Sequence, residues 1–141
     1  PSLYDSALRI LERVSTSGNV AFEQEVIPGI TAIQALAAGH RMALNRIGDP
    51  FLVTTGRRLA ENGLPENADT AVVLLDGQQA FRSVADKDAM IYWGAYLGTP
   101  DEILVSGRLG DVESEIVRLR EEARHRHGWI MDTYLLRKPK R

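Results

Sequence analysis

The sequence contains no cysteine, which excludes disulfide bonds and metal sites built from thiolates. It also contains no apolar run as long as a membrane-spanning helix and no signal-peptide pattern. Its net charge is only −2, so no general attraction to nucleic acid or to an anionic membrane is expected. We therefore expect a cytoplasmic protein that needs no metal and has neither a nucleic acid nor a membrane as partner.

Length and composition indicate a globular chain. Its 141 residues suffice for one ordinary domain or for parts of two small ones. The sequence is 44% apolar and 26% charged, which is usual for such proteins.

The stretch from Val26 to Asn45 predicts a strand that turns directly into a helix. Val26-Ile27 is apolar and β-branched, and Pro28-Gly29 ends the strand because proline lacks an N–H donor. Thr31 then lies where a helix N-cap is wanted. Such a junction leaves free N–H groups at the carboxyl end of a sheet, where α/β folds bind ligands, although an ordinary βα turn has the same pattern.

Strand and helix signals alternate along the rest of the chain. A mixed sheet is expected, with the apolar run 70–75 central and a hairpin through 98–101. Asp111 is the expected N-cap of the last helix, and 60–69 has the composition of turns. Helices are predicted over 1–14, 31–39, 78–84 and 111–127, and strands over 20–27, 51–55, 70–75, 90–95, 102–106 and 129–136.

Few side chains indicate chemistry. Arg57-Arg58 directly follows a predicted strand, and a guanidinium pair there suits a carboxylate-rich ligand, with surface salt bridges as the alternative. Asp76 also follows a strand and is a turn residue by default. His125 and His127 fall at a helix end, where they complement the helix dipole rather than bind a metal.

Several motifs together resemble the tetrapyrrole methylases, which use S-adenosylmethionine. Val26 to Ala32 resembles the Pro-Gly-Ile-Thr motif of this family, and Pro1 to Tyr4 the tail of its Gly-Asp-Pro loop. Thr54 to Arg58, Val72 to Gly77 and Ile103 to Leu109 resemble three further family segments in the same order. The resemblance extends over essentially the whole chain, while the Gly-rich loop of the family's N-terminal part has no counterpart here.

The resemblance implies an α/β fold in two parts. Residues 1–45 would be the C-terminal part of the first, cofactor-binding α/β domain with its parallel sheet. Residues 46–141 would be the second domain, a mixed five-stranded sheet flanked by helices. Contacts to S-adenosylmethionine would carry over to Leu3, Pro28, Gly29, Thr31, Ala32, Asp76 and Leu97.

The stretch from His40 to Leu59 is most similar to the corrin branch of the family. It implies a methyltransferase of cobalamin biosynthesis that methylates C1 of precorrin-5 and releases acetate. The carboxylates of the tetrapyrrole would bind to Arg41, Arg46, Arg57 and Arg58. The sequence does not identify the base for deacetylation, for which Asp76, Asp49 and His40 are only candidates.

Two alternatives stay open at this point. One is a related methyltransferase acting on protein or RNA, and the other is a non-catalytic fragment that serves dimerisation. Family members commonly pair, so a homodimer is expected. We also expect the 141 residues on their own to be inactive, because the family's N-terminal part supplies much of the cofactor site.

Overall fold

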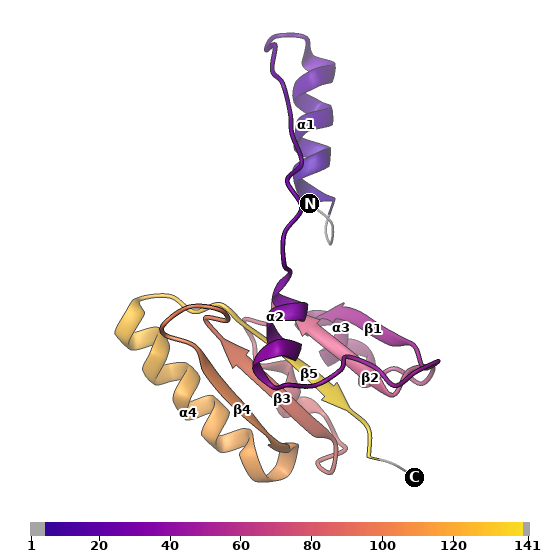
Figure 1. Ribbon diagram of the computed structural model, residues 1–141, viewed down its shortest axis with the longest axis vertical. Coiled ribbons are helices and arrows are strands. Elements are labelled where there is room, and N and C mark those ends of the chain that lie inside the picture. The colour runs from indigo at the N-terminus through magenta and orange to yellow at the C-terminus, as the bar shows by residue number, and fades with distance from the viewer. Residues whose placement is uncertain (1–4, 140–141) are drawn as a thin grey trace.

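The computed structural model describes residues 5–139 and consists of a body and a projecting arm (Figure 1). The arm contains helix α1 and the extended segment after it, which together stand away from the body. The body contains the sheet and the other helices. The elements are α1 (Ser6–Ser17), α2 (Ala32–Gly39), β1 (Phe51–Thr55), α3 (Gly56–Asn62), β2 (Thr70–Leu74), the 3₁₀ helix η1 (Ala80–Ser83), β3 (Met90–Ala95), β4 (Ile103–Arg108), α4 (Leu109–His127) and β5 (Asp132–Arg137).

The five strands form one mixed sheet in the order β1-β2-β5-β3-β4. β1 and β2 are parallel, whereas the other three neighbouring pairs are antiparallel. The predicted mixed five-stranded sheet flanked by helices is therefore confirmed, as is the β3–β4 hairpin. β2 is fully buried and lies inside the sheet, although the middle position belongs to β5.

Helices cover both faces of the sheet, and the side chains of β2 alternate between them. Val72 and Leu74 pack with α2 on one face. Val73 points to the other face, where α3, η1 and α4 contribute to the larger core around Phe81 and Trp93. A Cβ at Gly94 would come within 2.9 Å of Leu36, so the glycine allows α2 to lie close to β3. None of the helices between residues 5 and 139 could cross a membrane.

The predicted strand over 20–27 is wrong. These residues are extended but pair with no other strand in the structure, and their apolar side chains, such as Ile27 at 78% exposure, face solvent. A strand needs a neighbour for its backbone groups, and β-branched residues alone do not supply one. The preceding helix also differs: it runs from Ser6 to Ser17 and ends at Gly18, and the predicted first residues 1–4 lie outside the described part.

Other boundaries also differ from the prediction: the helix expected over 78–84 is only the 3₁₀ helix η1, and β4 runs from 103 to 108 rather than from 102 to 106. α3 occupies 56–62, where turns were expected from 60, because the Thr55 side chain caps its first turn and the chain leaves the helix at Gly63. α4 begins at Leu109 without a capping side chain, and Asp111 lies in its first turn. The N–H groups of Leu109 and Gly110 instead donate to carbonyls before β3. β5 begins at 132 rather than 129.

Candidate functional site

A cavity of about 560 Å³ lies at the end of the sheet where β2 and β3 finish and β5 begins. The antiparallel pairing of β5 with both neighbours brings these three strand ends together, with Ala95 opposite Asp132. The N-terminus of α2 completes the lining. The lining segments are 30–32 with 35, 74–77, 96–97 with 99, 129–133, and Arg120 from α4.

Four of the seven residues predicted to bind the cofactor line this cavity, namely Thr31, Ala32, Asp76 and Leu97. Pro28 and Gly29 lie in the exposed extended segment before α2 and are not part of the lining. Leu3 lies outside the described residues. The structure thus brings together four residues that lie up to 66 positions apart in the sequence, from Thr31 to Leu97, and the binding roles of these residues stay predictions.

Thr31 caps α2 as predicted. Its hydroxyl accepts a hydrogen bond from the Gln34 N–H, and the Gln34 side chain in turn accepts from the Thr31 N–H, which forms a complete capping box. Because the hydroxyl is used in this way, Thr31 and Ala32 offer the cavity mainly backbone and a small apolar surface.

The Asp76 carboxylate is fully engaged within the protein. It accepts hydrogen bonds from the N–H groups of Gln78 (3.2 Å) and Ala80 (2.7 Å) and from the Tyr134 hydroxyl (2.6 Å). Burial, followed by this hydrogen bond, raises the pKa of Tyr134 far above its ordinary value. A Cβ at Gly56 would lie 2.3 Å from the carboxylate, so the first turn of α3 can approach Asp76 this closely only because residue 56 is a glycine. The contacts favour a structural role for this side chain.

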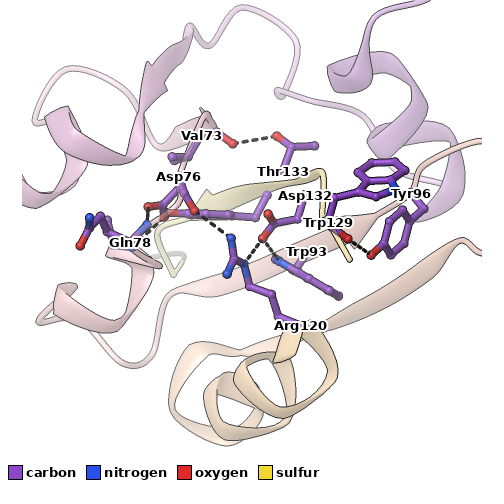
Figure 2. A network of polar contacts seen from close by, with 11 residues as sticks. Val73, Asp76, Gln78, Trp93, Tyr96, Arg120, Trp129, Asp132 and Thr133 are labelled. Atoms are coloured by element: carbon purple, nitrogen blue, oxygen red, sulfur yellow. Dashed lines mark hydrogen bonds and ion pairs between the residues drawn. The ribbon is translucent and has the colours of Figure 1, made fainter. Parts of the chain in front are cut away.

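A buried ion pair forms the floor of the cavity (Figure 2). Nε of Arg120 and Nε1 of Trp93 both donate to the same oxygen of Asp132, at 3.0 and 2.9 Å. The side chains of Arg120 and Asp132 are only 8% and 7% exposed. The sequence analysis missed this network. Its one sequence signal is that Arg120 falls on the buried stripe of α4 with Ile116 and Ala123, where a charge needs a partner.

Aromatic side chains form one wall of the cavity. The Tyr96 hydroxyl donates to the Trp129 carbonyl at 2.6 Å, and the two rings meet edge to face at 5.1 Å. The His127 ring lies 4.9 Å from Tyr96, so this histidine packs inward from the helix end. Burial raises the pKa of Tyr96, with smaller contributions from Asp101 and Asp132. Trp129 stays 56% exposed and is accessible to a ligand.

The four arginines predicted to bind substrate are not brought to one place. Arg57 and Arg58 are exposed in the first turn of α3, at the same end of the sheet as the cavity. Arg41 follows the C-terminal end of α2 and is not part of the lining, and Arg46 pairs with Asp69 before β2, at the opposite end of that strand. Their roles stay predictions, with Arg57 and Arg58 the better placed.

The remaining candidates for a base also differ in environment. His40 Nε2 lies 3.0 Å from the Trp93 carbonyl oxygen, which can only accept, so this nitrogen carries the proton and His40 anchors the end of α2. Asp49 lies in the loop before β1, away from the cavity. Over the described residues, no group of three or more histidine or acidic side chains could hold a metal ion.

The α/β body with a ligand-sized cavity where its strands end is the arrangement by which such folds bind small molecules. Residues 1–113 match the family of Tetrapyrrole (Corrin/Porphyrin) Methylases, and the chain belongs to this family. The resemblance inferred from the sequence motifs is therefore confirmed.

Two individual proteins of this family are similar to the chain over nearly its whole length. The chain is 59% identical to precorrin-6A synthase [deacetylating] from Sinorhizobium sp. over 138 residues, which are 98% of this chain and 52% of that protein. It thus spans about half the length of this curated relative. The crystal structure of a cobalamin synthesis related protein (CobF) from Corynebacterium diphtheriae matches with a TM-score of 0.87 and 43% identity, over 99% of this chain and 58% of that one.

A more distant structure supports the fold. Uroporphyrin-III C-methyltransferase from Thermus thermophilus in complex with S-adenosylhomocysteine matches with a TM-score of 0.56 and 20% identity. The match covers 95% of this chain and 59% of that chain.

Proposed function

We propose that the chain is the C-terminal half of a precorrin-6A synthase (deacetylating). Such an enzyme is an S-adenosylmethionine-dependent C-methyltransferase of cobalamin biosynthesis, which methylates C1 of precorrin-5 and releases acetate. The observation that carries the proposal is the 59% identity to a protein of that name over nearly the whole chain. Because the chain spans about half of that relative, the activity belongs to the larger enzyme.

The cavity at the strand ends fits S-adenosylmethionine. Its volume of about 560 Å³ falls within the range of about 300–1,000 Å³ usual for small-molecule sites. Leu97, Met131 and Trp129 give it apolar walls, and Asp132 gives it a polar floor. When bound, the cofactor supplies an electrophilic methyl group. The task of these residues is then to hold the donor in line with the acceptor carbon and to exclude water.

The substrate would lie next to the cavity, on the side of β1. Gly56 contacts Asp76, so the first turn of α3 is adjacent to the cavity lining. Arg57 and Arg58 extend from that turn into solvent, where two guanidinium groups can bind the carboxylates of a tetrapyrrole. The positive end of α3 adds to this attraction.

The arm supports the proposed division into two domains. Val20, Phe22, Val26 and Ile27 are exposed along it, and no residue of α1 is buried. An apolar extended segment beside an amphipathic helix is what an α/β domain would bury. We propose that residues 1–45 complete the first domain of the larger enzyme and that 46–141 form the second, with α2 packed against the sheet of the second domain. A homodimer and a cytoplasmic location stay predictions.

Exposure around the cavity supports weak cofactor binding by this chain alone. Ile30, Leu75, Met131 and Trp129 line it, yet each is more than half exposed. A cofactor needs walls on more than one side, so the first domain would cover this open side. We therefore propose that the 141 residues bind the cofactor far more weakly than the full-length Sinorhizobium relative and are inactive by themselves.

Two measurements test the proposed function. Calorimetric titration of S-adenosylhomocysteine should give much weaker binding for the 141-residue chain than for the full-length relative. Micromolar binding by the chain would refute its dependence on a second domain. In the full-length enzyme, replacing Arg57 and Arg58 by glutamine should weaken tetrapyrrole binding by about 1.5–3 kcal/mol per lost contact and leave cofactor binding nearly unchanged. Unchanged corrinoid affinity would show that the pair is structural.

A further inference from the structure

Asp132 is the lining carboxylate that retains an unused oxygen. Both oxygens of Asp76, the other carboxylate in the lining, accept hydrogen bonds. In Asp132, Arg120 and Trp93 donate to Oδ2, whereas Oδ1 has no hydrogen-bond partner among residues 5–139. The side chain is 7% exposed. Oδ1 is not fully buried, since Gln79 Oε1 is the one fully buried side-chain atom without a partner over residues 5–139; Oδ1 is therefore open to the cavity, where a donor of a ligand can replace solvent.

The surroundings of Asp132 determine which hydrogen-bond donor of a ligand suits Oδ1. Arg120 already neutralises the carboxylate, so the floor has little net attraction for an ammonium or sulfonium group. A neutral N–H or O–H donor suits it better. The walls near this floor are apolar and flat, with Leu97, Met131 and Trp129 in the lining. A ribose diol against such walls would leave one hydroxyl without a partner, whereas a purine buries apolar faces and carries its amino group at one edge.

We propose that Oδ1 of Asp132 accepts a hydrogen bond from the exocyclic amino group of the cofactor's adenine and thereby selects adenosyl over 6-oxopurine cofactors. This inference rests on the proposed function of the cavity. Arg120 and Trp93 act as positioning residues, because both donate to Oδ2 (Figure 2) and thereby leave Oδ1 available to a ligand.

The substitution Asp132→Asn tests the inference by inverting the hydrogen-bonding group. The two floor donors require an acceptor, so the asparagine carbonyl takes the place of Oδ2 and its NH₂ group faces the cavity. The probes are S-adenosylhomocysteine and S-inosylhomocysteine, which has a carbonyl in place of the amino group. We expect the wild-type chain to bind the adenosyl compound about tenfold or more tightly than the inosyl compound, and Asp132→Asn to reverse this preference.

The measurement is an NMR titration of the 141-residue chain to millimolar ligand, which detects weak binding. Asp101→Asn is the matched control, since it makes the same charge change at an exposed position outside the lining and should keep the wild-type preference. If Asp132→Asn does not fold, the double substitution Arg120→Met with Asp132→Asn removes both buried charges and keeps the Trp93 donor. The same reversal is then expected.

The outcomes separate this inference from the proposed function. Equal affinity of the wild-type chain for the two compounds, or an equal loss of both in Asp132→Asn, would overturn the adenine contact and leave the cofactor cavity standing. Binding of neither compound by the full-length enzyme that contains this chain would overturn the cofactor cavity and the adenine contact together.

Discussion

Replacing Tyr134 by phenylalanine should destabilise the body of the protein through a single lost hydrogen bond. The hydroxyl donates to the Asp76 carboxylate at 2.6 Å, and the two residues are only 1% and 7% exposed, so solvent screens the contact little. A buried hydrogen bond to a charged group contributes about 1.5–3 kcal/mol. The ring itself stays packed edge to face on Phe81. We therefore expect a loss of about 2 kcal/mol in the free energy of unfolding at pH 7.

The same substitution should alter the response to alkaline pH. Burial and the contact with Asp76 raise the pKa of Tyr134 far above its ordinary value, while in the unfolded chain the phenol ionises near pH ~10. Above that pH the unfolded state binds fewer protons than the folded state. Below pH ~10 the stabilisation that Tyr134 contributes is fully present. Above pH ~10 this stabilisation is lost at about 1.4 kcal/mol per pH unit.

Urea unfolding followed by circular dichroism, at pH 7 and in steps from 9 to 11, measures both effects. The wild-type chain should lose stability more steeply than Tyr134→Phe above pH ~10, so that the difference between them narrows. Tyr92→Phe is the control, because in the described structure the Tyr92 hydroxyl makes no hydrogen bond. Equal stability at pH 7, or parallel alkaline profiles, would refute this reasoning.

Two further substitutions test the packing around the cavity. Gly56→Ala should lower the free energy of unfolding by about 1–3 kcal/mol, because the added Cβ would overlap the Asp76 carboxylate, which three donors hold in place. Gly29→Ala is the control, since open space surrounds Gly29 and the stability should change little. Similar urea midpoints for the two variants would contradict the packing described. Thr31→Ala should lower the free energy of unfolding by about 0.5–2 kcal/mol, because it removes the side-chain cap of α2. Hydrogen exchange of the amides in the first turn of α2 should then become faster, and an unaltered exchange rate would contradict the role of the cap.

Local patterns were sufficient for the core of the fold. The run at 70–75, apolar after Thr70, predicts a buried interior strand, which is confirmed over 70–74 while Leu75 is exposed; the Thr31 cap predicts the start of α2, which is also confirmed. The segment 20–27 has an equally good strand pattern, yet pairing is a property of two segments, and no partner for it occurs in the described chain. α3 shows the reverse case. Thr55 caps it, a signal that the sequence analysis did not use because turn residues follow from 60.

The candidate site was predictable only on one side. Thr31, Ala32 and Asp76 belong to family motifs and Leu97 is implied by the resemblance, and the structure places all four at one cavity. The opposite side comes from α4 and β5, where no motif marks Arg120 or Asp132. Whether a charged residue on a buried helix stripe meets its partner depends on the position of β5 in the sheet, which sequence periodicity does not determine.

The strand order has a consequence for the time course of folding. β5 is the last strand along the chain, yet it separates the β1-β2 pair from the β3-β4 hairpin. Thr70 pairs with Arg137 across 67 positions, so the two halves of the sheet share few contacts until the final strand inserts. During synthesis the earlier strands therefore remain two half-sheets with open edges, and the sheet closes only once β5 has emerged. Nascent chains are expected to need protection from edge-to-edge association until that moment.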